Sequence, residues 1–318
     1  MNNIKVSIIC LVYNHELYLR KCLDGFVNQK CNFEYEVLIH DDASTDNSAS
    51  IIREYEEKYP NIIKPIYQTE NQMSKGVKIS PAYLYPKAKG EYLAWCEGDD
   101  YWTDENKLQR QVDFLDANPE YSACVHRFDI VDKLDNKIDI KSFGCYENEG
   151  DYTLDDFQKY DLPSQLATLV SRNVITNDIE KCSRLFAVSL QGDIKLFLFL
   201  LLNGKLWRMG EKSSVYRLVR EETGTSWTSR MIADKKRYRK QWNGIKALEK
   251  FIEEEYGIKI NCKKRKQQMA FNDIIVDKRA FEIIKKTTYY VFMQRGMIFF
   301  LFKKIFRGLR SKVLENKK

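Results

Sequence analysis

The chain has 318 residues, enough to bury a large hydrophobic core, and a formal net charge of +7. Residues 287–318 hold eight Lys or Arg and one acid, so this segment carries the excess charge and the rest of the chain is neutral. A charge confined to one end argues against a general nucleic-acid surface and favours a local anionic contact. The eight cysteines form no CxxC pair and only three histidines are present, which argues against a disulfide framework and a zinc site.

The first 126 residues alternate between predicted strands and predicted helices. Apolar runs predict strands over residues 5–12, 35–39, 62–67, 92–96 and 121–126. Pro65 places the third of these strands near a sheet edge. Apolar residues at intervals of three and four predict helices after the first two strands and over residues 108–115. Such βα units predict an α/β fold with a doubly wound, mainly parallel sheet and a Rossmann-like nucleotide-binding half.

The pattern weakens between residues 128 and 161, where Leu134–Lys137 (LDNK) predicts a hairpin turn. Short strands are predicted over residues 165–170, 206–209 and 215–218. Between the first two of them lies a very apolar predicted helix, with Asp193 near its first turn. Beyond residue 231 the chain is predicted to be helical and highly charged.

Acidic residues directly follow two of the predicted strands. Asp41 and Asp42 follow the second strand, and Glu97, Asp99 and Asp100 follow the fourth. In open α/β sheets ligands bind at the carboxyl ends of the strands, where carboxylates can hold a hard cation against a phosphorylated ligand. Each cluster alone could be a solvated acidic turn, but the two together favour a binding site.

Four segments of the chain resemble glycosyltransferase family 2, a large group of inverting enzymes with the GT-A fold. They read VSIICLVYNHELYLRKCLDGFVNQ, EVLIHDDASTDNS, KGEYLAWCEGDDYW and QGDIKLFLFLLLNGK, in this order along the chain. The resemblance covers about residues 4–220 and is most specific over the first 125 residues. It implies a GT-A-like core and a nucleotide-diphosphate sugar as the donor.

The same resemblance implies which residues bind the nucleotide. Asp42 corresponds to the aspartate that reads the base, and Tyr13 and Asn14 lie in the loop that lines the same pocket. Asp99 and its neighbour Asp100 are expected to share the contacts to the ribose and to the metal ion. The nucleotide site is therefore expected to join the ends of three strands.

Glu97, Gly98 and Asp99 take the place of the metal-binding DxD motif of the family. The expected ligands of Mg²⁺ or Mn²⁺ are Glu97, Asp99 and Asp100. Such a cation stabilises the negative charge that develops on the diphosphate leaving group. Two positions depart from the family pattern. Glutamate stands at the first position of the motif, and no histidine follows Tyr216 and Arg217, where many relatives place a further metal ligand.

Asp193 corresponds to the catalytic base that takes the proton from the acceptor hydroxyl. Because aspartate is also a preferred N-cap residue, capping is the alternative role of Asp193, and the two roles can coexist. His15, His40 and His126 are expected to make local hydrogen bonds rather than to act in catalysis. Trp102 is expected to pack in the core and is a candidate for the pocket wall.

These features predict an inverting glycosyltransferase in cell-surface polysaccharide synthesis, with UDP as the expected sugar carrier and a glycan or lipid-linked hydroxyl as the acceptor. One alternative is a non-catalytic, nucleotide-binding or membrane-associated scaffold. Another is a sugar-1-phosphate nucleotidyltransferase, which the sequence disfavours because Tyr13–Glu16 stand where a glycine-rich phosphate loop would follow the first strand.

We expect one GT-A-like domain over residues 1–225 and a helical, basic C-terminal extension over residues 226–318. Residues 290–318 mix apolar residues with Lys and Arg, which is typical of segments on an anionic membrane surface; the alternative is a helix packed on the protein. Residues 220–224 resemble a flexible acceptor-side segment of relatives, and an ordinary charged loop is the alternative. No signal peptide or membrane span is apparent, so we expect a cytoplasmic protein that attaches peripherally to the inner face of the cell membrane.

Overall fold

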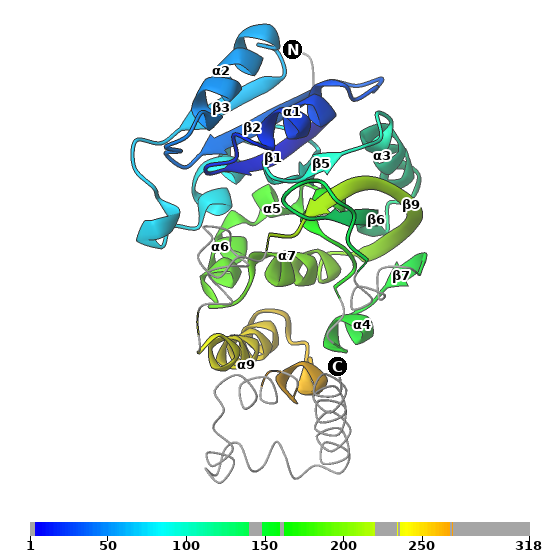
Figure 1. Ribbon diagram of the computed structural model, residues 1–318. Helices are drawn as coiled ribbons and strands as arrows, with labels where there is room; N and C mark the ends of the chain where they lie inside the picture. The colour runs from blue at the N-terminus through cyan, green and yellow to red at the C-terminus, as the bar shows by residue number, and fades with distance from the viewer. Residues whose placement is uncertain are drawn as a thin grey trace, which may run out of the picture.

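The computed structural model describes residues 4–139, 148–159, 162–219, 234, 236–267 and 269. Within these residues one nine-stranded sheet has the order β3-β2-β1-β4-β8-β6-β9-β5, and β7 pairs with β9 (Figure 1). The strands are β1 (Val6–Val12), β2 (Tyr35–Asp41), β3 (Ile63–Tyr67), β4 (Tyr92–Trp95), β5 (Tyr101–Trp102), β6 (Tyr121–Val131), β7 (Gly150–Tyr152), β8 (Val170–Arg172) and β9 (Lys205–Arg217). The α/β fold class is confirmed.

The first four strands form the parallel half of the sheet. β1 pairs in parallel with β2 and β4, and β2 pairs in parallel with β3. β3 lies at the sheet edge, as Pro65 predicted, because proline cannot donate a ladder hydrogen bond. The carboxyl ends of β1, β2 and β4 therefore lie side by side.

The second half of the sheet is mixed. β8 runs antiparallel between β4 and β6, β6 pairs in parallel with β9, and both β5 and β7 are antiparallel to β9. The antiparallel pairs bring the end of β9 beside Tyr101, just after the acidic cluster. The last residue of β9 therefore lies against residues 99 and 100, which follow β4.

Two predicted strand boundaries in this half are wrong. Residues 166–168 form a 3₁₀ turn in place of a strand, because the backbone N–H and hydroxyl of Thr168 both donate to the Gln165 carbonyl. β8 begins only at Val170. The predicted strands over 206–209 and 215–218 are one long strand, β9, which follows β6 through register shifts at Val125 and Arg127.

Helices cover both faces of the sheet (Figure 1). One face carries α1 (Leu19–Val27), α2 (Ser48–Lys58) and α3 (Lys107–Ala117); the other carries α4 (Leu154–Gln158), α5 (Val174–Asn177), α6 (Ile179–Ala187), α7 (Gly192–Leu201) and α9 (Arg237–Tyr256). Successive strand residues point to opposite faces, so Ile8 packs in the first layer and Ile9 in the second. Both layers of core are therefore anchored on the same buried strands.

α9 belongs to the region predicted as a C-terminal extension, yet its Ile245, Leu248 and Ile252 are part of the core under α6 and α7. An ion pair of 2.6 Å between Arg184 and Glu255 joins α9 to α6. The proposed membrane segment, residues 290–318, and the acceptor-side segment, residues 220–224, lie outside the described residues. No helix in the described part of the chain combines the length and the apolar character that crossing a membrane requires.

Candidate active site

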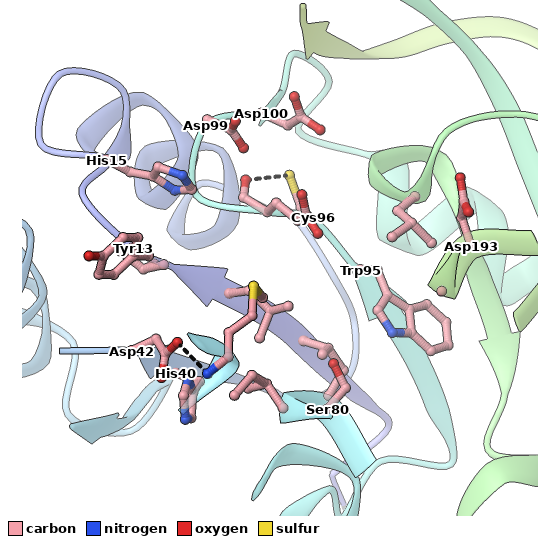
Figure 2. A pocket seen from close by; sticks show the side chains of 18 of the residues that line it. Tyr13, His15, His40, Asp42, Ser80, Trp95, Cys96, Asp99, Asp100 and Asp193 are labelled. Atoms are coloured by element: carbon pink, nitrogen blue, oxygen red, sulfur yellow. Dashed lines mark hydrogen bonds between the residues drawn. The ribbon is translucent and has the colours of Figure 1, made fainter. Parts of the chain in front are cut away.

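A pocket of about 440 Å³ opens at the carboxyl ends of the parallel strands. Its walls come from the residues that follow β1, β2 and β4, from the first turn of α7 and from the end of β9. Figure 2 shows Tyr13 and Asp42 at one end of the pocket, Asp193 at the opposite end, and Asp99 and Asp100 between them in that view. The fold thus brings predicted site residues from four separate segments to one cavity.

The loops after β1 and β2 form the end of the pocket that holds Tyr13 and Asp42. Asp42 is 4% exposed, and its two carboxylate oxygens accept the backbone N–H groups of Gln72 at 2.7 Å and Met73 at 3.0 Å. Asn14 is not part of the pocket wall. Its side-chain oxygen accepts the backbone N–H of Thr45 at 2.8 Å, so Asn14 ties the two loops together.

The acids that follow β4 differ in exposure. Glu97 is exposed to the pocket, Asp99 is partly exposed and Asp100 is 5% exposed. Burial and then the charge of Asp99 raise the pKa of Asp100, while the backbone N–H of Arg217 donates to its carboxylate at 2.7 Å. Burial and the nearby charges of Asp99 and Asp193 also raise the pKa of Glu97, although solvent reaches this side chain and screens part of the effect. The cluster therefore concentrates negative charge that a cation would relieve.

The donor set at this cluster fits Mg²⁺ or Mn²⁺ when the ion is shared with a substrate. The described residues contain no group of three His, Cys, Asp or Glu side chains that could hold a metal ion unaided. Mg²⁺ commonly takes one or two protein carboxylates and completes its shell with water and substrate phosphates. Asp99 and its neighbour Asp100 line the pocket and can supply that number.

Asp193 is the second residue of α7 and not its N-cap, so the capping alternative is wrong. The N-cap is Gln191, and the Asp193 carboxylate accepts the N–H of the next residue, Ile194, at 2.7 Å. An acid in the first turn of a helix is stabilised by the helix dipole. Burial has the largest effect and raises the pKa of Asp193, while the hydrogen bond from Ile194 and then the positive charge of Arg265 lower it in part. Because Asp193 is only partly buried, solvent screens part of this rise.

The family model of glycosyl transferase family 2 matches residues 7–171, which is more than half of the chain. The chain belongs to this family. The match covers nearly all of the first of the four resembling segments and all of the second and third, and the α7 segment with Asp193 lies beyond it.

Relatives match this chain in sequence over part of its length. An uncharacterized protein of Mycobacterium tuberculosis, Rv1520, is 48% identical over 121 residues, which is 38% of this chain and 34% of that protein. A poly(ribitol-phosphate) beta-glucosyltransferase of Bacillus spizizenii is 40% identical over 106 residues, which is 33% of this chain and 16% of that protein. The matches therefore span about a third or less of the length of these relatives.

Solved structures with the same fold cover most of the chain. S. aureus TarS 1-349 has a TM-score of 0.58 at 16% identity, covering 89% of this chain and 75% of that one. Its complex with UDP-GlcNAc has a TM-score of 0.54 at 18% identity, covering 91% and 87%. At such low identity the likeness shows the GT-A-type fold.

Arg217 is a functional candidate that the sequence pattern did not reveal. Its side chain is 1% exposed, lies 4.1 Å over the ring of Tyr18 and pairs with the Asp135 carboxylate at 2.7 Å. It also donates to the backbone carbonyls of Asp99 at 3.0 Å and Asp132 at 2.8 Å. Arg217 thereby fixes the acidic cluster against the LDNK turn, where the φ of +64° at Asp135 confirms a tight turn.

The predicted packing and hydrogen-bonding roles of Trp102 and the three histidines are confirmed only in part. Trp102 does not line the pocket: its ring lies 4.9 Å from Phe26, and its indole N–H donates to Ala167. His40 and His126 make the expected local hydrogen bonds. His15 lines the pocket, as do the aromatic side chains of Tyr85, Trp95 and Phe186, none of which the motifs identified.

We expect Arg217→Lys to lower the free energy of unfolding by about 2 kcal/mol, because an ammonium cannot reproduce the planar fork that serves three acceptors. Urea denaturation measures this change. The matched control is Lys212→Ala on the same strand, whose exposed pair with Asp129 at 2.6 Å should contribute no more than about 0.5 kcal/mol. Equal losses for the two variants would contradict the anchoring role of Arg217.

Proposed function

We propose that this protein is an inverting glycosyltransferase that transfers a sugar from a nucleotide diphosphate, with UDP as the expected carrier, to a hydroxyl of a glycan or lipid-linked acceptor. The observation that carries the proposal is the convergence of Asp42, Asp99 and Asp193 on one pocket from three separate segments. The names of a glucosyltransferase relative and of a UDP-GlcNAc complex with the same fold support the donor class and a role in cell-surface polymers.

In this proposal different parts of the pocket bind the nucleotide, hold the metal ion and accept the proton. Tyr13 and Asp42 bind the nucleotide, while Asp99 and Asp100 are the residues that would hold a divalent ion. When bound, Mg²⁺ or Mn²⁺ neutralises the charge that develops on the leaving diphosphate. Asp193 takes the proton from the acceptor hydroxyl as that oxygen attacks the anomeric carbon from the face opposite the leaving group, which inverts the configuration.

A cytoplasmic location and a contact between residues 290–318 and an anionic membrane surface are part of the proposal, and they rest on the sequence alone. A lipid-linked acceptor would make such a contact useful. The membership of family 2 favours sugar transfer over the nucleotidyltransferase alternative. The scaffold alternative predicts that the carboxylate of Asp193 is dispensable.

The Asp193→Asn variant tests the proposal because it removes the base and keeps the shape. We expect the rate of sugar transfer to fall by about 10² to 10⁴ while the affinity for the donor stays within about twofold. Product formation measures the rate, and calorimetry measures the affinity. The control is Asp155→Asn, an exposed first-turn acid of α4 outside the pocket, which should leave both unchanged. Full activity of Asp193→Asn would support the scaffold.

The raised pKa of Asp193 also predicts a pH dependence. Only the ionised carboxylate can accept a proton, so activity is lost as the pH falls through the pKa of Asp193, which burial sets above the ordinary 3.8. A plot of log kcat/KM against pH should show this acidic limb, and Glu97→Gln should retain it. A rate that stays constant down to pH 4 would contradict the assignment.

A further inference from the structure

Met73 is an exposed large apolar side chain in the wall of the pocket. Four large apolar side chains of the described residues are exposed, namely Leu17, Met73, Leu134 and Ile258. Of these four, only Met73 lines the pocket, where 46% of it is open to solvent. An exposed apolar side chain inside a polar-rimmed pocket indicates a ligand contact.

The backbone that carries Met73 is held by Asp42. The two carboxylate oxygens of Asp42, which Figure 2 labels, each accept one N–H, from Gln72 and from Met73. A carboxylate offers about four lone-pair positions, so Asp42 keeps acceptor capacity for a ligand. Asp42, which we expect to contact the ligand, therefore also fixes the backbone position of Met73.

Local hydrogen bonds order residues 70–76, the segment that carries Met73 at the pocket wall. The N–H and hydroxyl of Ser74 bond to the side chain and carbonyl of Asn71, both at 2.7 Å. Gly76 ends the turn at a φ of +85°, a conformation that favours glycine, and its N–H donates to the Met73 carbonyl at 3.0 Å. Because this wall is already ordered, binding a ligand against it costs little conformational entropy.

We propose that Met73 covers one face of the nucleobase of the donor, at the end of the pocket that it shares with Tyr13, and that Asp42 presents Met73 by holding its backbone. This inference rests on the proposed nucleotide donor. A planar base offers a weakly polar face and a polar edge, so it suits a polarisable thioether above the face and a carboxylate at the edge. In this proposal Met73 adds affinity for the nucleotide. Asp42 contacts the edge of the base and also positions the backbone of Met73.

Calorimetric titration in Mn²⁺ with UDP, UMP and inorganic pyrophosphate tests the contact, because only the first two probes carry a base. We expect Met73→Ala to weaken UDP and UMP equally, by about fivefold, which corresponds to losing roughly 40 Å² of apolar contact. Its affinity for pyrophosphate should stay within about twofold. Met73→Leu should bind like the wild type, as should the control Ile258→Ala, which alters an exposed apolar residue outside the pocket.

The outcomes separate this inference from the proposed function. Wild-type binding of UDP with unchanged affinity in Met73→Ala would overturn the Met73 contact alone, and so would an equal loss of pyrophosphate affinity. A wild type that binds no UDP would overturn the donor proposal together with the contact.

The positioning role of Asp42 has its own readout. Hydrogen exchange in peptides that cover residues 70–77 should accelerate at least about tenfold in Asp42→Asn, because the amide NH₂ opposes one of the two backbone N–H donors. Exchange at the wild-type rate would overturn the positioning role.

Discussion

The constraint on which the rest of the site depends is the crowding of carboxylates at the ends of parallel strands. Adjacent parallel strands end at one edge, so acids that are separated along the chain come to face one cavity. There burial, and then the charges of neighbouring carboxylates, raise the pKa of Glu97 and of Asp100. The protein offsets part of this repulsion with fixed donors. The backbone N–H of Arg217 bonds to Asp100, and the backbone N–H groups of residues 72 and 73 bond to Asp42. Within the described residues no such donor is bound to the carboxylates of Glu97 and Asp99, which both line the pocket. The proposed divalent ion would bind at this cluster.

The parallel half of the fold could be predicted because each of its signals is local. A run of apolar residues followed by a polar turn and a helical stripe identifies β1 with α1 and β2 with α2, and strand polarity alone then brings Asp42 and the acids after β4 together. The mixed half could not be predicted in the same way. β8 spans only three residues and is specified by its neighbours β4 and β6, and β9 follows β6 through irregular register shifts that leave no regular pattern.

The residues that the motifs missed share one property, which is that their roles depend on distant partners. Arg217 acts through Asp99 and Asp135, more than 80 positions away in the chain, so no window of sequence reveals it. Met73 lies in a stretch that is polar and unpatterned, yet Asn71, Ser74 and Gly76 fold that stretch by short-range bonds and Asp42 attaches it to the pocket. Conversely, the motif predicted that Asn14 lies in the loop that lines the nucleotide pocket, but its side chain instead accepts a hydrogen bond from the backbone of Thr45 in the loop after β2.

The most direct test of the central claim is a calorimetric comparison of UDP binding to the wild type and to Asp99→Asn, each with Mn²⁺ and with EDTA. If the strand-end acids hold a metal against the diphosphate, Mn²⁺ should tighten binding to the wild type by at least about tenfold, and Asp99→Asn should remove most of that gain. Binding that is equally tight without metal, or that keeps its full metal dependence in Asp99→Asn, would contradict the role assigned to the acidic cluster.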